Sequence, residues 1–147
     1  MRRLRRFLAL PPRDRRIRAR ASATVWAVRL CLWVAPFSWV RRLIARLARR
    51  VREAAPATAG DDEQIAHAVR FAAARVPGAS CLTQALAARA MLGRAGLPGE
   101  LRIGVRRDDG SFLNAHAWIE RPDGAVLIGD HDVATFTVLP PLPGETG

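Results

Sequence analysis

Residues 77–96, PGASCLTQALAARAMLGRAG, decide how we interpret this chain. A proline and a glycine break any preceding helix, Ser80 is a typical N-cap residue, and the residues that follow contain no helix breaker until Gly93. The pattern predicts a helix that begins at Cys81. A thiol in the first turn lies at the positive end of the helix dipole, where free N–H groups favour the thiolate, the form that attacks carbonyl carbon.

Downstream of this helix, the chain alternates strand-like and turn-like segments. Residues 101–105 (LRIGV) and 113–120 (LNAHAWIE) have strand composition, and the sequence RDDG between them predicts a hairpin. A second turn, Pro122-Asp123-Gly124, leads into residues 125–130 (AVLIGD). Helices followed by an antiparallel meander predict an α+β fold. His116 lies in the middle strand, from which it can act as the base for the thiol.

The second turn predicts which carboxylate faces His116. A three-residue loop with glycine in its third position pairs Arg121 with Ala125 and, if this register continues, places Asp130 directly opposite His116. Asp130 would then hold the imidazole through Nδ1 and leave Nε2 for the thiol, as a nucleophile–base–orienter triad requires. A two-residue loop would turn Asp130 to the other face of the sheet. Asp132 has the same parity and is the alternative orienting residue.

Both site residues also have simpler structural interpretations. Cys81 can be a small buried hydrophobe and His116 a strand histidine bonded to backbone, and spacing alone does not separate these interpretations from catalysis. Cys31 lies in an apolar stripe and His67 stands alone on a helix predicted over residues 63–75, so neither is assigned a chemical role. We expect no metal or other cofactor, because no cysteine–histidine or acidic cluster has the spacing of a zinc or calcium site.

The N-terminal third has a different surface from the rest of the chain. Residues 1–52 contain 16 of the 24 basic residues and a single acidic residue, a net charge of +15, whereas the remainder carries −4. We therefore expect a basic amphipathic helical segment over residues 1–55 and a catalytic core over 56–140. Pro36 predicts a break between two helices in the basic segment, over residues 13–35 and 37–54.

An apolar stripe follows these two helices. Its members recur near helical spacing: Trp26, Leu30, Trp33, Val40, Leu43 and Leu47. Such a stripe can pack on the rest of the protein, receive a partner or lie on a membrane, and packing with a solvated arginine face is the favoured interpretation. If the stripe is free, we expect it chiefly to dock a partner protein or peptide, with peripheral membrane contact secondary. The tryptophans are not interleaved with the arginines, which disfavours nucleic acid.

The sequence contains no segment that predicts secretion or membrane insertion. Two cysteines fifty residues apart make no disulfide framework, and the apolar stretch at residues 7–10 is too short for a signal peptide. Arg29 and Pro36 interrupt the longest apolar region, residues 21–40, which makes a transmembrane helix improbable. We therefore expect a cytoplasmic protein.

Several segments together resemble one known family. CLTQALA from Cys81, LPGELRIGV over residues 97–105 and AHAWIE over 115–120 are similar to the transglutaminase-like leader peptidase of lasso-peptide biosynthesis, the B protein of those clusters. The arginine-rich start, RRFLALPP over residues 5–12, also resembles that family. The likeness covers most of residues 2–138.

The resemblance implies a papain-like cysteine protease that removes the leader from a ribosomally made precursor. The family's Cys, His and Asp fall on Cys81, His116 and Asp130. Gly124 follows Glu120 one position later than in the family pattern, so Asp132 still competes for the orienting role. The chain has no room for a winged-helix module, which implies the split form. Its partners would be the precursor peptide, a separate leader-recognition protein and an ATP-dependent lasso cyclase.

Two other functions compete with leader removal. The same triad could pass the acyl group to an amine rather than to water. Alternatively, the chain could be a non-catalytic adaptor whose basic segment docks on an anionic membrane or a partner protein.

Overall fold

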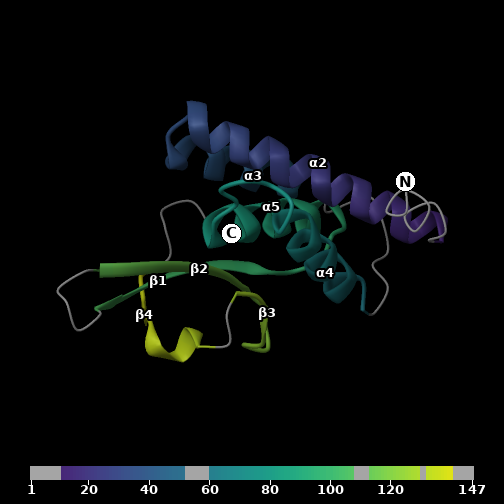
Figure 1. The fold of residues 1–147 in the computed structure, drawn as a ribbon. Helices are drawn as coiled ribbons and strands as arrows, with labels where there is room; N and C mark the ends of the chain where they lie inside the picture. The colour runs from purple at the N-terminus through teal and green to yellow at the C-terminus, as the bar shows by residue number, and fades with distance from the viewer. Residues whose placement is uncertain (1–10, 52–59, 108–112, 130–131, 141–147) are drawn as a thin grey trace.

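The fold packs two layers of helices on one face of an antiparallel sheet (Figure 1). In this computed structural model the described residues are 11–51, 60–107, 113–129 and 132–140, with the backbone alone for residues 47–51. Within them the chain forms four α-helices and then a four-stranded sheet. This arrangement confirms the predicted α+β fold.

Helices α2 (Pro12–Val34) and α3 (Phe37–Val51) form the basic N-terminal layer. Pro12 occupies the first position of α2, where its missing N–H has no intrahelical partner to lose. Ala35 is extended, with ψ 145°, because the ring of the following Pro36 disfavours the helical conformation. The predicted break at Pro36 is confirmed. Among the described residues, no helix is both long and apolar enough to cross a bilayer.

Helices α4 (Asp61–Ala73) and α5 (Cys81–Arg94) form the inner layer. The first turn of α4 carries three acidic residues, which the positive end of the helix dipole stabilises. Helix α5 contacts each of the other three helices as well as strands β1, β2 and β3. It is therefore the central helix of the fold, and its alanine-rich sequence lets its neighbours approach closely.

A single apolar core joins the helices to the sheet. It includes Val25 of α2, Val40 of α3, Val69 of α4, Leu86 of α5 and Ile119 of β2, all at most 3% exposed. The basic N-terminal helices thus pack on the same core as the rest of the described chain. The expected boundary near residue 55 lies outside the described residues.

The packing interpretation of the apolar stripe is wrong for most of its members. Val40 is buried, but the other members whose side chains are described are about half exposed or more: Trp26, Leu30, Trp33 and Leu43. The inward face of α2 consists instead of Ala21, Val25 and Val28. These small side chains let the backbone of α2 approach α4 and α5 at a distance that tryptophan would not allow. The side chain of Leu47 lies outside the described residues.

The sheet has the strand order β3-β2-β1-β4, and all neighbouring strands are antiparallel. Its strands are β1 (Glu100–Arg107), β2 (Leu113–Glu120), β3 (Val126–Ile128) and β4 (Thr137–Val138). The meander of the first three confirms the sequence prediction. Strand β4 and the preceding 3₁₀ turn η1 (Val133–Thr135) were not predicted. They lie across the sheet from the helices, and β4 pairs with the outer edge of β1 (Figure 1).

The turn between β2 and β3 is the predicted three-residue loop. The Arg121 N–H donates to the Ala125 carbonyl at 2.9 Å, and the Gly124 N–H donates to the Arg121 carbonyl at 3.0 Å. Gly124 has φ +84°, the left-handed conformation that glycine adopts without steric cost.

The register beyond this turn departs from the prediction. The ladder shifts by one residue where Ile119 pairs with Ile128 instead of Leu127. Leu127 and Ile128 are both buried, and this bulge lets two consecutive side chains enter the core. The continuous register that placed a carboxylate directly opposite His116 is therefore wrong. Asp130 itself lies outside the described residues.

Candidate active site

Cys81 is the first residue of α5, as predicted. The Ser80 hydroxyl accepts a hydrogen bond from the Thr83 N–H at 3.4 Å, which confirms Ser80 as the N-cap. The buried Thr83 hydroxyl lies 3.3 Å from the Ser80 hydroxyl, and this second hydrogen bond fixes the position of the capping side chain. Cys81 is a half-buried free thiol at the margin of the core. The Thr83 N–H is used by this cap, which leaves the N–H groups of Cys81 and Leu82 as the donors of the first turn that a ligand could use.

Helix α2 supports the loop that precedes Cys81. The Arg29 Nε donates to the Pro77 carbonyl at 3.4 Å. Its guanidinium also fills the space beside Gly78, where an added Cβ would lie 2.6 Å from Nη2. The basic helix therefore helps to hold the chain that leads into Cys81.

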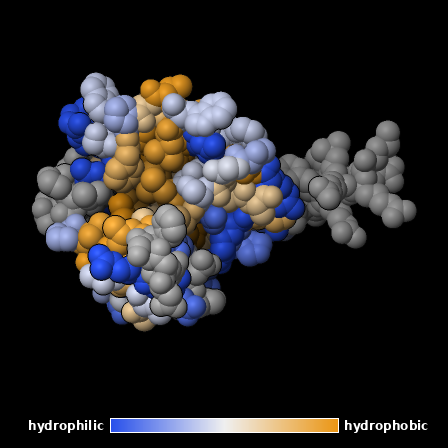
Figure 2. Space-filling model, turned by 60° about the vertical axis from the view of Figure 1, so that its left-hand side comes forward, coloured by the Kyte–Doolittle hydropathy of each residue, from blue (hydrophilic) through white to orange (hydrophobic). Residues whose placement is uncertain are grey.

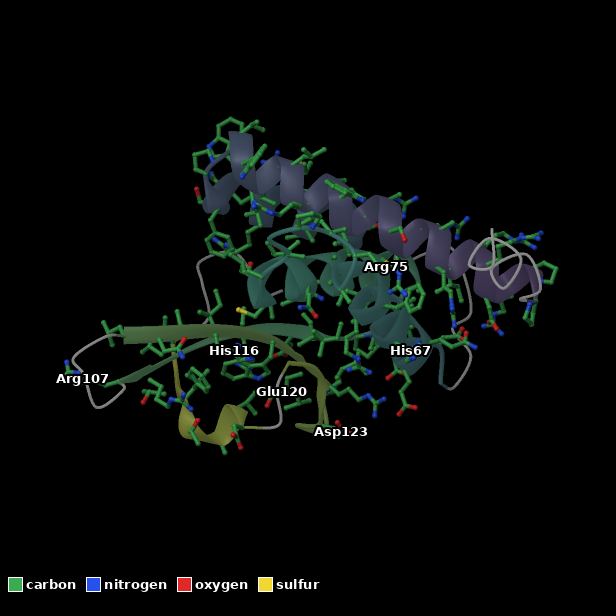
Figure 3. The ribbon with its side chains drawn as sticks, viewed as in Figure 1. His67, Arg75, Arg107, His116, Glu120 and Asp123 are labelled. Carbon is green, nitrogen blue, oxygen red and sulfur yellow. The ribbon has the colours of Figure 1, made fainter. Side chains whose placement is uncertain are left out.

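His116 lies in the middle of β2, opposite Gly104 of β1. Strand alternation directs Ala117 and Ile119 into the helix-facing core. It directs His116 to the opposite face of the sheet, on the same side as Glu120 (Figure 3). The imidazole is half-buried there.

Two aromatic rings pack against the imidazole. The Phe136 centroid lies 5.2 Å from the imidazole centroid and the Trp118 centroid lies 6.1 Å away, the latter in a stacked geometry. Trp118 is 2% exposed, and its shielded Nε1–H has no hydrogen-bond partner among the described residues, so packing is what holds the ring there. A Cβ added to Gly104 would lie 2.9 Å from the Phe136 Cβ and 2.9 Å from the Trp118 Cη2, which shows that this glycine makes room for the indole.

Sequence reasoning missed Phe136 because it follows η1, which was not predicted. The available signal was local: Phe136 is flanked by threonines and followed by Val138, a composition that favours a short strand. The Arg106 guanidinium carbon also lies 4.9 Å from the centroid of the Phe136 ring. Phe136 thus links β1 to the wall of the imidazole site.

The imidazole nitrogen Nε2 is directed toward the end of β3. It lies 3.6 Å from the position that a Cβ would take on Gly129. Gly129 has φ +136°, and an added Cβ would come within 2.6 Å of the Trp118 Cβ, so this position requires glycine. Nε2 is therefore the imidazole nitrogen on the side of Gly129.

The third member of the predicted triad is not placed by the structure. Asp130 lies outside the described residues. Asp132 is exposed and precedes η1, where its carbonyl accepts hydrogen bonds from the N–H and the hydroxyl of Thr135. Its carboxylate does not cap that turn. Among the described residues, no group of acidic, cysteine or histidine side chains has the arrangement of a metal site.

The structure places the two predicted site residues on opposite faces of the sheet. Helix α5 covers the face of the sheet that carries Ala117, whereas His116 points to the other face. Strand β3 pairs with β2 only at Ile119 and Glu120. Within the described part of the chain, residues 113–118 have no strand partner on that side, so the edge next to His116 is not closed by a neighbouring strand.

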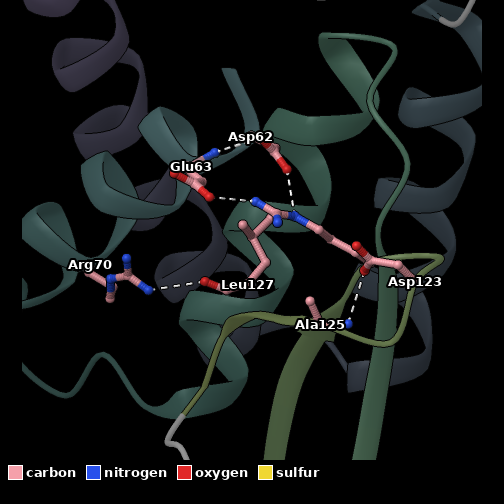
Figure 4. A network of polar contacts seen from close by, with 7 residues as sticks. Asp62, Glu63, Arg70, Asp123, Ala125 and Leu127 are labelled. Carbon is pink, nitrogen blue, oxygen red and sulfur yellow. Dashed lines mark hydrogen bonds and ion pairs between the residues drawn. The ribbon is translucent and has the colours of Figure 1, made fainter. Parts of the chain in front are cut away.

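A separate polar network ties α4 to the β2–β3 hairpin (Figure 4). Arg121 Nη2 donates to Glu63 Oε1 at 3.0 Å, and its Nε lies 2.7 Å from Asp62 Oδ2 as an ion pair without hydrogen-bond geometry. The hydrogen bond to Glu63 raises the pKa of Arg121 above its usual value. Arg70 donates to the Leu127 carbonyl at 3.0 Å. These contacts fix the hairpin that leads toward the imidazole site.

An open cavity of about 560 Å³ lies beside this network, between the start of α4 and the hairpin. Its lining includes Asp62, Leu97, Pro98 and Arg121, and neither Cys81 nor His116 contributes to it. Because Asp62 and Glu63 are already paired with Arg121 and Asp123 accepts the Ala125 N–H, we interpret this region as structural.

Comparison with known protein families identifies the family of this chain. Residues 24–140 match the family described as the transglutaminase-like superfamily, a range that runs from α2 beyond β4 and includes both Cys81 and His116. No curated protein and no solved structure matches the chain. Because the family match covers most of the sequence, the chain belongs to the transglutaminase-like superfamily.

Proposed function

We propose that this chain is a cysteine peptidase that removes the leader from a ribosomally made lasso-peptide precursor. The observation that carries the proposal is the position of Cys81, the first residue of the central helix, which packs directly on the strand that bears His116. Nucleophilic acyl transfer needs a thiol and a base within reach of each other, and this helix start and this strand are the elements that would supply them. The superfamily match and the sequence resemblance support the same reaction class.

In the proposed mechanism, the Cys81 thiolate attacks the carbonyl carbon of the scissile peptide bond. His116 takes the thiol proton and gives it to the leaving amine, and backbone N–H groups in the first turn of α5 stabilise the oxyanion. Water, deprotonated by His116, then attacks the thioester and releases the acid product and the free thiol. Cys81 and His116 belong to opposite faces of the sheet, so the proposed proton transfer requires the two side chains to meet around the edge of β2, where residues 113–118 have no strand partner within the described residues.

A carboxylate orients the imidazole in this proposal. The direction of Nε2 toward Gly129 supports a contact between Nε2 and Asp130, which leaves Nδ1 for the thiol. This assignment exchanges the roles of the two nitrogens relative to the sequence expectation, but keeps the same three residues. Asp132 remains the alternative orienting residue.

The proposed partners follow from the split form of the peptidase. A separate leader-recognition protein presents the precursor peptide, and an ATP-dependent lasso cyclase closes the ring after the leader is removed. The mechanism itself requires no cofactor, because the thiol, the imidazole and water supply every reacting group.

The test is leader removal by the full chain, with the precursor and recognition protein encoded beside it, followed by mass spectrometry. Hydrolysis yields two fragments whose summed mass exceeds that of the precursor by one water. Transfer to an amine yields a linked product without that water, and an adaptor yields intact precursor. Cys81→Ala should abolish the hydrolytic fragments, and Cys31→Ala is the matched control because Cys31 is also a half-buried free thiol.

A further inference from the structure

The outer side of the N-terminal helices carries an unusual concentration of exposed apolar side chains. Six of the large exposed hydrophobic residues of the protein lie on α2 and α3, and we call them the tryptophan face: Trp26, Leu30, Trp33, Val34, Trp39 and Leu43. Three of the four tryptophans of the chain belong to it. Trp33 is 75% exposed and Val34 85%, so the face contributes almost nothing to the core.

The spacing of these residues groups them on the outer side of each helix. On α2, Trp26, Leu30 and Trp33 recur after four and three residues, which places them on one side of the helix. Ala21 and Val25 occupy the buried side. Trp39 and Leu43 are one turn apart on α3, and α2 and α3 both pack on α5. Their outer sides therefore belong to one helix layer (Figure 1).

One side of the molecule also carries other apolar surface. Figure 2 shows a band of hydrophobic residues that runs from the top of the molecule toward the sheet and is bordered by hydrophilic residues. Contiguous exposed apolar surface of this kind usually marks a binding surface.

Positive charge is built into the face itself. The Arg29 guanidinium lies 5.4 Å from the Trp33 ring centroid, and the Arg42 guanidinium lies 5.9 Å from that of Trp39. Residues 15–52 contain no acidic residue. Cations and indole rings are therefore presented together, and nothing in that stretch of sequence neutralises them.

We propose that the tryptophan face binds the surface of an anionic membrane. Tryptophan favours the boundary between lipid headgroups and acyl chains, and neighbouring arginines pair there with lipid phosphate. Positive charge that no acidic residue interrupts over residues 15–52 complements an extended anionic surface better than the local charge pattern of one protein partner. This interaction is independent of the proposed peptidase activity.

The face also lies close to the chain that precedes the candidate nucleophile. Arg29, which stacks on Trp33, is the residue that donates to the Pro77 carbonyl and fills the space beside Gly78. Membrane binding through this face would therefore hold the Cys81 loop near the lipid surface.

The experiment is flotation of the full chain with vesicles of phosphatidylcholine alone or mixed with phosphatidylglycerol. We expect the chain to float with the anionic vesicles and to remain in the lower fraction with the neutral ones. Tryptophan emission should shift to shorter wavelength on binding, and the shift reports on the face because the fourth tryptophan, Trp118, is already buried. The double variant Trp33→Ser/Trp39→Ser should lower the partition coefficient by about tenfold or more, since it removes two large apolar side chains from the interface.

Matched controls separate the face from general charge and apolarity. Leu113→Ser removes an exposed apolar side chain from the sheet, and Arg107→Gln removes an exposed charge there. Both should bind like the native chain, whereas Arg42→Gln/Arg46→Gln should weaken binding and reduce its sensitivity to salt.

Three outcomes would overturn the proposal. One is failure of the native chain to float with anionic vesicles at low salt. Another is unchanged binding by the Trp33→Ser/Trp39→Ser variant, which would assign the interaction to arginine charge alone. The third is a protein-docking result: neither vesicle type binds the native chain, and the Trp33→Ser/Trp39→Ser variant loses self-association or binding to the leader-recognition protein. That result would make the face a protein-docking surface.

Discussion

Substitution of Gly104 by alanine tests how tightly the imidazole site is packed. The added methyl group would lie 2.9 Å from the Phe136 Cβ and 2.9 Å from the Trp118 Cη2, where ordinary contacts begin near 3.4 Å. Trp118 is buried and cannot swing into solvent, so one of the two aromatic residues must shift. Overpacking of this kind costs about 1–3 kcal/mol of unfolding free energy, a large share of the roughly 5–15 kcal/mol typical of a small domain.

The same substitution should slow leader removal more than its stability cost explains. The imidazole of His116 packs on the two rings that must move. A displacement of about 1 Å in a catalytic group can reduce the rate by about 100-fold. We therefore expect Gly104→Ala to lower kcat by at least about tenfold at a temperature where the variant is fully folded.

Gly124→Ala is the matched control for this experiment. Gly124 has φ +84°, and a Cβ added there would meet no atom within 4 Å, so alanine costs about 1 kcal/mol in backbone strain without touching the imidazole site. Urea unfolding gives the stability of each variant, and mass spectrometry of precursor cleavage gives the rate. The reasoning is refuted if Gly104→Ala unfolds at the native urea concentration, or if both variants cleave at the native rate.

Further predictions concern the orienting carboxylate, the hairpin network and the thiol. Asp130→Asn should slow cleavage by about two orders of magnitude or more while Asp132→Asn does much less, measured at equal thermal stability, and the reverse order would identify Asp132 as the orienting residue. Arg121→Gln should lower the unfolding free energy by at most about 1 kcal/mol, because its ion pairs with Asp62 and Glu63 are partly exposed. The loss should shrink in high salt, and a loss that does not depend on salt would contradict an ionic origin. Iodoacetamide should modify Cys81 before Cys31 near neutral pH, as peptide mapping would show, and the opposite order would argue against an activated Cys81.

Local signals predicted most of the fold. Ser80 and Pro36 act through the conformation of their immediate neighbours, so the start of α5 and the break between α2 and α3 could be read from the sequence. The loop ending at Gly124 likewise followed from residue type and spacing. The position of Cys81 in the first turn of a helix was therefore predictable.

Features that depend on distant packing were not predictable in the same way. The bulge that shifts the register at Ile119 exists because Leu127 and Ile128 both enter the core, and their apolar run has no alternation to reveal this. Strand β4 pairs across more than thirty residues through only two positions. Its short length gave no periodic signal, so Phe136 was missed as a wall of the site.

The buried side of α2 illustrates a different difficulty. The helix has apolar residues on both sides, and the larger ones at Trp26 and Trp33 suggested the wrong side for the core. Close helix packing selected the side with Ala21 and Val25 because small residues allow a shorter distance to α4 and α5. Side-chain hydrophobicity alone therefore did not predict which side of α2 is buried.

The central claim is that Cys81 and His116 act as one catalytic unit, and a double-mutant cycle on precursor cleavage tests it most directly. Cleavage rates are measured for the native chain, Cys81→Ala, His116→Ala and the variant with both substitutions, each confirmed as folded by its urea transition. Residues that act as a unit are strongly non-additive, so each single substitution should reduce cleavage about as far as the double substitution does. Native cleavage by Cys81→Ala, or losses that multiply in the double variant, would contradict the claim.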